Sequence, residues 1–413
     1  MKVIELPTIN FIGKDKVSKY HQQVPYKVLN HVDEKSCGSS DNKIIHGDNL
    51  EVLKSLLPEY QGKIKCIYID PPYNTGNENW IFNDNVNDPK LQKWLGQVVG
   101  LEGEDFNRHD KWLCMMYPRL QLMQKLLSDD GYIFISINFK DEFHYLRCIC
   151  DEIFGVNNYV GTITWESTTQ PTNSGNSKFG LQVKTEPILF YKGRNAENIF
   201  KLTPSEIKNS YPHEGRFGKC RFEIIETSDA GSFNRPTMKF KILGQYPREG
   251  RRWKIGEDTA RQLELAGKVE IVNGIVKKAV YPEDEIDKIK YLPFWSHFKA
   301  EEYGTAQSGK EILNTIMNES LGFDTVKPPK LIEGLLSHLD KNIIVLDAFA
   351  GSGTTAHAVI NLNNSDGGDR KFILIERENY CDSITAERVR RIGGKFNYYE
   401  VGDDRIADDK FYW

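Results

Sequence analysis

The chain has 413 residues, of which 39% are hydrophobic, 27% charged and 11% aromatic. This length predicts roughly two or three domains with a sizeable core, and the composition excludes collagen, a long coiled coil and an intrinsically disordered protein. The net charge of -4, taken alone, argues weakly against a polyanionic partner.

The apolar runs are short. The best of them, 132–137 and 343–350, have the length of strands, whereas a transmembrane helix needs about 20 apolar residues. Glu5 and Pro7 interrupt the N-terminal apolar stretch and no small-residue cleavage site follows, so we expect a cytoplasmic protein without a signal peptide. Seven scattered cysteines without metal-site spacing predict reduced thiols, no disulfide and no structural metal.

Strand-like and helix-like stretches alternate between residues 43 and 165. The apolar runs Ile64–Asp70 and Tyr132–Ile137 predict strands, and apolar positions recur with helical spacing over 50–57 and 112–127. Such alternation predicts a parallel sheet with helices on its faces.

The pattern changes between residues 166 and 300. Here β-like runs alternate with turns such as Asn273-Gly274 and helical periodicity is weak, which predicts a β-rich domain. The helix and strand alternation returns over 301–413, so the sequence predicts one doubly wound α/β domain interrupted by an insertion and preceded by an extension, 1–42, without an assigned role. The β-like runs of the insertion are Ile188–Tyr191, Phe222–Ile225, Phe240–Leu243 and Val269–Val276.

Charge is unevenly distributed along the chain. Between Lys178 and Lys254 there are 16 Lys and Arg against 8 Asp and Glu, a net charge of +8, so the rest of the chain carries -12. A basic segment therefore lies inside an acidic protein.

A glycine-rich turn follows the predicted strand 343–346, with the sequence Asp347-Ala348-Phe349-Ala350-Gly351-Ser352-Gly353-Thr354-Thr355. Glycines let the backbone approach a ligand, and exposed N–H groups can bind an anion. The turn lacks the third glycine of a dinucleotide fingerprint and the Gly-Lys-Ser/Thr of a phosphate loop, which disfavours NAD and ATP. Glu376 ends the next predicted strand, where a carboxylate can accept hydrogen bonds from ribose hydroxyls. These features favour half of a nucleoside-binding site over a purely structural turn.

The second motif is Asp70-Pro71-Pro72-Tyr73-Asn74-Thr75-Gly76, at the end of the predicted strand 64–70. Two prolines fix the backbone and remove two N–H donors, so carbonyl acceptors remain beside a carboxylate and an aromatic ring. This arrangement suits an amino group on a planar, stackable ligand. A rigid turn with ordinary packing of Tyr73 is the alternative.

These motifs resemble those of β-class DNA adenine N6-methyltransferases, above all the modification (Mod) subunits of type III restriction–modification systems. The Asp-Pro-Pro-Tyr string is similar to their catalytic motif and the glycine-rich turn to their S-adenosylmethionine loop. Four further strings resemble segments of the family: 110–120, 129–137, 150–155 and 323–332. The chain looks shorter than typical type III subunits, and Asn138-Phe139-Lys140 stands where relatives commonly have acidic residues.

The resemblance implies a Rossmann-like, S-adenosylmethionine-dependent methyltransferase domain in two segments: a catalytic half at 43–165 and a cofactor-binding half at 301–413. The insertion 166–300 is then the target-recognition domain. The implied catalytic residues are Asp70, Pro71, Pro72 and Tyr73, with Tyr73 stacking on a flipped-out base. The implied cofactor residues are Asp48, Lys327, Asp347, Phe349, Ala350, Gly351, Ser352, Gly353, Thr354 and Glu376.

The implied partner is double-stranded DNA. Basic and aromatic residues interleave in the insertion, and its candidate DNA contacts are Arg221, Arg235, Arg248, Arg251, Arg252 and Lys254. For any one arginine, a solvated surface charge is the competing interpretation.

Asp at the first motif position resembles adenine-specific members, so the expected reaction is methylation of adenine N6. Methylation of the cytosine amine or of RNA, and a non-catalytic specificity subunit, are the alternatives. The sequence leaves open whether the chain forms a homodimer. It also leaves open whether a separate restriction subunit supplies a nuclease and a helicase, for which this sequence shows no signature.

Overall fold

The computed structural model describes residues 8–74, 93, 96, 108–171, 178–200, 203–204, 210–230, 235–285, 291–323 and 325–404. The chain divides into two compact units. Unit 1 comprises Met1–Phe200 and Trp295–Trp413, and unit 2 comprises Lys201–Phe294.

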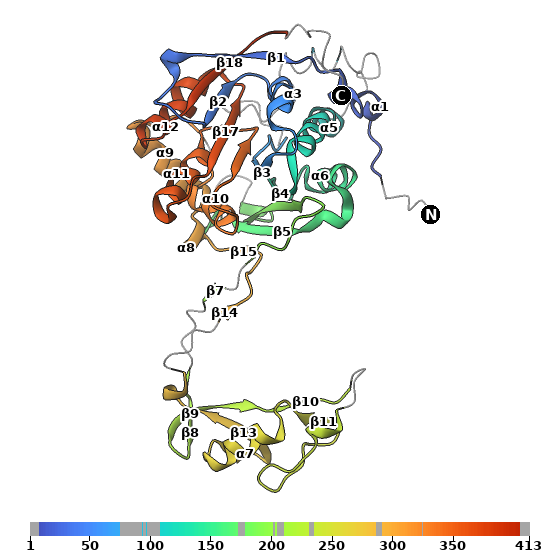
Figure 1. The fold of residues 1–413 in the computed structure, drawn as a ribbon, viewed down its shortest axis with the longest axis vertical. Coiled ribbons are helices and arrows are strands. Elements are labelled where there is room, and N and C mark those ends of the chain that lie inside the picture. Colours follow the sequence, from blue (N-terminus) through green and yellow to red (C-terminus); the bar gives the residue numbers. More distant parts are fainter. Residues whose placement is uncertain are drawn as a thin grey trace. The chain divides into compact units, whose positions relative to one another are not determined.

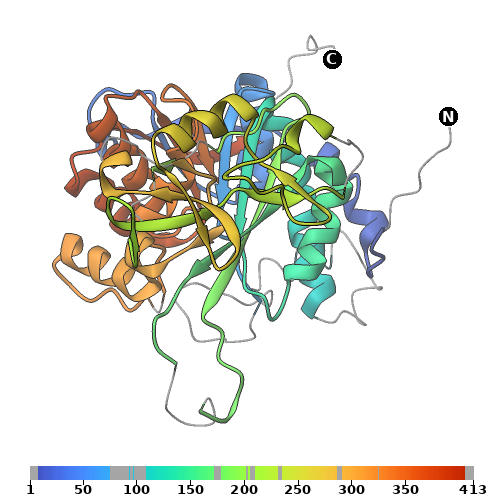
Figure 2. The ribbon, with the colours of Figure 1, turned by 90° about the horizontal axis from the view of Figure 1, so that it is seen from below.

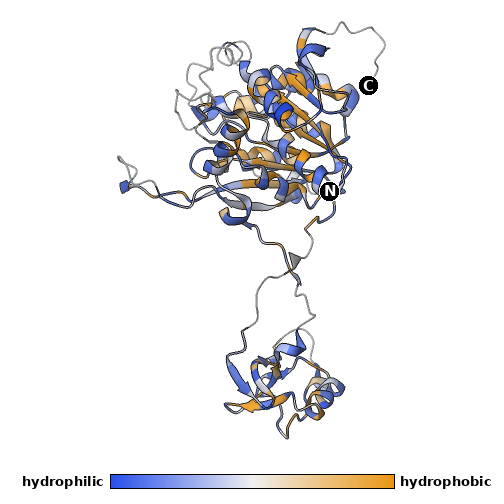
Figure 3. Ribbon diagram, turned by 90° about the vertical axis from the view of Figure 1, so that its left-hand side faces the viewer, coloured by the Kyte–Doolittle hydropathy of each residue, from blue (hydrophilic) through white to orange (hydrophobic). Residues whose placement is uncertain are grey.

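Unit 1 is built on a ten-stranded sheet in the order β1-β18-β2-β17-β16-β3-β4-β6-β5-β15. The six strands β18, β2, β17, β16, β3 and β4 are parallel to one another, and β6 pairs antiparallel with both β4 and β5. The central strands are apolar along most of their length because both sheet faces are covered, and they are orange in Figure 3. Their bounds are β1 (Lys27–His31), β2 (Lys43–His46), β3 (Ile64–Ile69), β4 (Leu127–Ser136), β5 (Tyr159–Glu166), β6 (Thr185–Lys192), β15 (His297–Phe298), β16 (Ile344–Asp347), β17 (Lys371–Glu376) and β18 (Asn397–Asp404).

Helices cover both faces of this sheet, with α3, α5 and α6 on one side and α9 to α12 on the other (Figure 1). The leucines of α3 that recur with helical spacing are buried, as are most side chains of α5. The predicted doubly wound domain is therefore confirmed. The helices are α1 (Lys14–Val17), α2 (Tyr20–Gln23), α3 (Asn49–Tyr60), α5 (Arg108–Leu126), α6 (Phe143–Cys150), α8 (Ala300–Tyr303), α9 (Ala306–Met317), α10 (Pro329–Leu336), α11 (Thr354–Asp366) and α12 (Glu387–Arg391).

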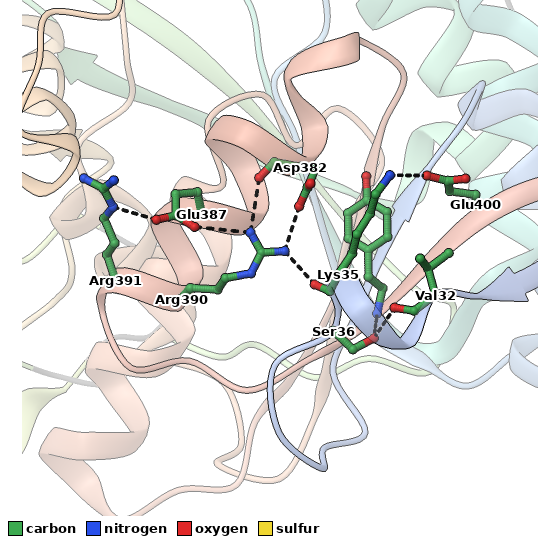
Figure 4. A network of polar contacts seen from close by, with 9 residues as sticks. Val32, Lys35, Ser36, Asp382, Glu387, Arg390, Arg391 and Glu400 are labelled. Atoms are coloured by element: carbon green, nitrogen blue, oxygen red, sulfur yellow. Dashed lines mark hydrogen bonds and ion pairs between the residues drawn. The ribbon is translucent and has the colours of Figure 1, made fainter.

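The N-terminal extension belongs to the sheet of unit 1. Its strand β1 pairs antiparallel with β18, a C-terminal strand that the sequence pattern did not predict. Figure 4 shows the polar network that fixes the extension: Arg390 donates to the carbonyl of Lys35 at 2.6 Å and to Asp382 at 2.7 Å, and Lys35 pairs with Glu400 on β18. The described part of 1–42 is thus an edge of the main domain.

Unit 2 is narrower than the insertion predicted at 166–300. Residues 185–192, predicted as part of the insertion, form β6 in the main sheet, and Glu166 still belongs to β5. The boundary was misplaced because a strand buried on both faces has the same apolar signature in either domain.

Unit 2 is β-rich, as expected. Its sheet has the order β12-β13-β9-β8, and Asn273 and Gly274 join β12 to β13 with positive φ angles of 54° and 75°, as a two-residue hairpin requires. Helix α7 (Glu257–Leu265) was not predicted, and Phe240–Leu243 forms an isolated bridge at Ile242 in place of the expected strand. The strands are β7 (Thr203–Pro204), β8 (His213–Gly215), β9 (Gly218–Ile224), β10 (Glu226–Ser228), β11 (Arg251–Trp253), β12 (Val269–Val272), β13 (Ile275–Val280) and β14 (Tyr291–Leu292).

None of the helices in the described residues is both long and apolar enough to span a bilayer. All seven cysteines lie in described segments, where they are unpaired, and five of them are buried.

Candidate functional site

The predicted catalytic and cofactor residues gather along one edge of the main sheet. Asp70 follows β3, the glycine-rich turn follows β16, Glu376 ends β17 and Asp48 follows β2. These four strands are parallel neighbours, so their carboxyl ends meet at the same edge. The two motifs, one from each half of the sequence, are brought together because β3 pairs directly with β16.

Asp70 lies in a charged cluster with Lys327. The ammonium of Lys327 donates to both carboxylate oxygens of Asp70, at 3.0 and 2.9 Å. It also donates to the hydroxyl of Tyr73 at 2.8 Å. Lys327, which the family resemblance assigns to the cofactor, therefore contacts the carboxylate of the Asp-Pro-Pro-Tyr motif in this structure.

Glu186 is the fourth member of this cluster and was not predicted. It lies 3.0 Å from the hydroxyl of Tyr73 and 3.4 Å from the ammonium of Lys327. Glu186 belongs to β6, which is antiparallel to β4, so the N-terminal end of β6 meets the carboxyl edge of the parallel strands. Because the sequence pattern places residues 185–192 in the insertion, it does not predict that Glu186 lies at this site.

The cluster holds one more carboxylate than it holds ammonium groups. The side chain of Lys327 is only 9% exposed, with the rings of Tyr73 and Trp165 at 5.0 and 5.8 Å. Burial opposes its charge, but the carboxylates of Asp70 and Glu186 outweigh that effect and raise the pKa of Lys327. Burial, reinforced by the same carboxylates, raises the pKa of the Tyr73 hydroxyl well above its ordinary value. Tyr73 is thus a neutral donor beside two carboxylates.

Close backbone packing positions Lys327. A Cβ on Gly309 of α9 would lie 2.0 Å from the carbonyl oxygen of Val326, so only glycine allows this approach. Gly309 therefore allows the segment before α10 to pass close to α9 and bring Lys327 to Asp70.

Side chains of α5 donate hydrogen bonds to the backbone of the Asp-Pro-Pro-Tyr turn and of the residue after it. The indole N–H of Trp112 donates to the carbonyl of Pro72 at 2.7 Å, and Arg108 donates to the carbonyl of Asn74 at 2.9 Å. Asn74 has a positive φ of 58° and donates to the buried carboxyl of Glu142. Asp141 and Glu142 directly follow Asn138-Phe139-Lys140, the segment where the family that the sequence resembles commonly has acidic residues. Thr75 and Gly76 lie outside the described residues.

The glycine-rich turn is held by two buried carboxyl groups. Asp347 accepts hydrogen bonds from the N–H of Phe349 and the hydroxyl of Thr355, so its oxygens face the turn itself. Glu376 accepts from the N–H of Gly351 at 2.7 Å and from that of Glu378 at 2.9 Å. Gly351 and Gly353 have positive φ angles, which glycine adopts without strain. Each oxygen of Glu376 keeps a second lone pair for a ligand donor.

Burial raises the pKa of Asp347 to about 7 and that of Glu376 to about 7, while hydrogen bonds within the turn act in the opposite direction. The folded protein therefore holds protons that the unfolded chain releases. The stability that these protonated groups contribute is fully present below the unfolded pKa, near 4.5 for Glu376, and is lost as the pH rises through about 7.

We therefore predict that Glu376→Gln flattens the pH dependence of stability. Between pH 5 and pH 8, wild type should lose about 1–3 kcal/mol more unfolding free energy than the variant, because glutamine has no proton to release. Urea unfolding of both proteins across this range checks it, with Asp347→Asn as a second variant. Parallel curves for wild type and both variants would contradict the assignment.

Arg388 of α12 lies under the turn and was not predicted. It is fully buried and donates to the hydroxyls of Ser352 and Thr354, both at 2.9 Å. Its other terminal nitrogen lies 3.2 Å from Nδ1 of His357, and no carboxylate pairs with it among the described residues. Burial lowers the pKa of Arg388 to about 9, and burial together with the arginine's charge lowers that of His357 to about 4. The imidazole is thus neutral and can accept a hydrogen bond. The side chains of Ser352 and Thr354 are thus buried, with their hydroxyls directed at Arg388.

Asp48 caps α3, accepting from the N–H of Leu50 at 2.8 Å. The buried Arg119 of α5 donates to both oxygens of Asp48 and to Asn49, and Asn49 donates to the carbonyl of Ala348 in the glycine-rich turn. The side chain of Asp48 remains 34% exposed. Arg119 thus links the ends of β2 and β16, a role that a single basic residue on an apolar helix does not signal.

The six predicted DNA contacts of unit 2 fall into two groups. Three are paired with carboxylates: Arg221 with Glu223 and Glu285, Arg248 with Glu226, and Arg252 with Asp229. The other three are exposed and form no ion pair with the described residues: Arg235, Arg251 and Lys254.

No group of three or more His, Cys, Asp or Glu side chains suited to a metal occurs in the part of the chain that the structure describes. From the contacts described above, the candidate site consists of the Asp70 cluster, the glycine-rich turn, and the carboxylates of Glu376 and Asp48.

A family model described as DNA methylase matches residues 64–387. Among curated relatives, the StyLTI Mod subunit of a type III restriction-modification enzyme from Salmonella typhimurium is 31% identical over 94% of this chain and 63% of its own length. The EcoP15I Mod subunit from Escherichia coli is 28% identical over 98% of this chain and 72% of its own. The type II methyltransferase M.KpnI from Klebsiella pneumoniae is 31% identical over 82% and 81%.

The chain thus spans a little under two thirds of the StyLTI subunit. Among solved structures, a DNA modification methylase from Thermus thermophilus, complexed with S-adenosyl-L-methionine, has a TM-score of 0.40 at 14% identity, covering 87% of this chain and 100% of that one.

Proposed function

The chain belongs to the DNA methylase family, and from this premise we propose that it transfers a methyl group from S-adenosylmethionine to the N6 amine of adenine in double-stranded DNA. The observation that carries the proposal is the adjacency of β3 and β16, which brings Asp70 and the glycine-rich turn to neighbouring positions at one sheet edge. A base and a nucleoside cofactor can meet there.

The residues of the turn fit an adenosyl cofactor. The two glycines leave its backbone open to close approach, Glu376 keeps lone pairs for ribose hydroxyls, and the partly exposed Asp48 lies next to it across β2 and β17. Phe349, Ala350, Gly351 and Gly353 would line the cofactor. S-adenosylmethionine supplies an electrophilic methyl group on a sulfonium centre.

Asp70 and the carbonyl of Pro71 activate the amine. The nitrogen lone pair of adenine is delocalised into the ring, so hydrogen bonds from the amine to these two acceptors favour a pyramidal nitrogen with a localised lone pair. The target base must leave the duplex to reach Asp70, and Tyr73 offers it a stacking surface.

Lys327 occupies the Asp70 carboxylate that the amine needs. The entering base therefore takes over hydrogen bonds that Asp70 now accepts from the ammonium, and Glu186, already 3.4 Å away, is the carboxylate that receives Lys327. With the lysine retained, the cluster keeps an excess negative charge, which favours a cationic methyl donor beside it.

We assign DNA contacts in unit 2 to Arg235, Arg251 and Lys254, the three of the six predicted cations that are exposed and form no ion pair with the described residues. Arg251→Ala should weaken DNA binding and lower the slope of log affinity against log salt by about 1 if it contacts a phosphate. Arg221→Ala is the matched control, since this arginine is held by two carboxylates, and it should leave the slope unchanged. Fluorescence anisotropy at several salt concentrations measures both; equal slopes for Arg251→Ala and wild type would exclude this contact.

The type III relatives support a wider arrangement. We propose that the chain works in the cytoplasm, either within a restriction–modification system, as a homodimer with a separate restriction subunit, or outside such a system as an orphan methylase. Co-purification with a coexpressed restriction subunit, and the mass of the purified chain in solution, distinguish these arrangements.

Expression in a host without DNA methylases tests the function. Long-read sequencing should detect methylated adenine in one fixed sequence context, absent from cells that carry Asp70→Ala. Unmodified adenines throughout, or modification of cytosine alone, would overturn the proposal.

A further inference from the structure

The connection between β5 and β6 forms an arm at the edge of the sheet that carries the site, and its described parts are residues 167–171 and 178–184. Figures 2 and 3 show it projecting from unit 1. Its base is paired, since the N–H of Ser167 donates to the carbonyl of Lys184 at 3.1 Å. Glu186, two residues further along, contacts Tyr73. The arm therefore leaves unit 1 directly beside the Asp70 cluster.

The second described part of the arm exposes apolar side chains at every second position. Phe179 is 82% exposed, Leu181 99% and Val183 51%. Residues of this size are normally covered in part, and three of them within five positions form an apolar strip. An exposed apolar strip of this kind is typical of a contact surface.

The charge of the arm favours nucleic acid as that occupant. Between Ser167 and Thr185 there are two lysines, Lys178 and Lys184, and no Asp or Glu. Lys184 pairs with Glu166, whereas Lys178 lies 4.9 Å over the ring of Phe179. The strip thus combines apolar side chains with cations, as DNA-wedging segments do.

Resting on the proposed function, we propose that this arm enters the duplex beside the target base, where Phe179 and Leu181 fill the space that the flipped base vacates. Flipping costs unstacking and unpairing free energy, which apolar contacts with the neighbouring bases offset. A partner protein on the same strip would instead cover the edge through which the base must reach Asp70.

The test compares two duplexes that carry the recognised sequence, one fully paired and one with an abasic position opposite the target adenine. A target without a pairing partner leaves its stack more easily and needs less help from a wedge. For Phe179→Ala/Leu181→Ala we expect kcat/KM to fall about tenfold to a hundredfold on the paired duplex and to approach wild type on the abasic one.

Val156→Ala is the matched control: Val156 is 40% exposed and precedes β5, at the strand's other end. It should behave as wild type on both duplexes. Phe179 and Leu181 are exposed, so thermal unfolding of the double variant should be unchanged.

Two results would overturn the proposed role of the arm and leave the proposed function intact: an equal loss of kcat/KM on both duplexes, or no loss of kcat/KM on either. A change in the oligomeric state of the double variant would overturn it too and assign the strip to a second copy of the chain. Absence of methylation of both duplexes by the wild-type chain would overturn the proposed function and the wedge with it.

Discussion

Asp70→Asn should lower the rate of methyl transfer by about a hundredfold to a thousandfold or more, the range seen when one hydrogen-bonding group at a reacting centre is lost. Asparagine has a single carbonyl acceptor, and its amide donates hydrogen bonds where the base's amine also donates. The amine then loses the charged acceptor that localises its lone pair. Single-turnover methylation of duplex DNA measures the effect.

Cofactor binding should survive this substitution. The predicted nucleoside contacts, Glu376 and the glycine-rich turn, lie on β17 and after β16, and the hydrogen bonds that hold Glu376 to the turn do not involve Asp70. Calorimetric titration with the cofactor should thus give the same affinity for variant and wild type. Full activity of Asp70→Asn would exclude Asp70 as the acceptor.

Lys327→Met should lower the transfer rate about tenfold to a hundredfold at pH 7. Asp70 and Glu186 would then face each other without the ammonium between them, and two close carboxylates favour the uptake of a proton by one of them. A protonated acceptor no longer attracts the amine. The rate of the variant should therefore recover as the pH is raised, which a pH profile of the single-turnover rate detects.

The double variant Lys327→Met/Glu186→Gln separates charge from packing. It has the same excess of one carboxylate as wild type, so it should recover part of the lost rate at pH 7, and Glu186→Gln alone provides the matched single variant. If the double variant is no faster than Lys327→Met at any pH, the lysine acts by packing and its charge is not what matters.

The framework of the site could be predicted from the sequence because it depends on local signals. Apolar runs mark β3 and β16, and a polar motif follows each of them, so the sequence alone predicts Asp70 and Asp347 at strand ends. Parallel strands then align their carboxyl ends, and the order of the strands completes the site.

The residues that complete the cluster depend on long-range pairing, which carries no local signal. Glu186 enters the site because β6 adds to the sheet in the antiparallel direction, and the position of Lys327 depends on the glycine of α9 that lets its backbone pass. Arg388 resembles any basic residue near a helix end until its burial is seen. The N-terminal extension gave no indication that it would pair with β18, because β1 is half exposed and lacks a strong apolar pattern.

The proposed function requires the Asp70 cluster and the glycine-rich turn to act together in methylating adenine N6. Incubating the purified chain with duplex DNA and methyl-labelled S-adenosylmethionine, followed by digestion to nucleosides and chromatography, tests this most directly. We predict that the label appears in N6-methyl-2′-deoxyadenosine, and that Asp70→Asn incorporates it about a hundredfold more slowly than wild type or slower still. Label in N4-methylcytosine, or label in methyladenine that the variant incorporates at the wild-type rate, would contradict it.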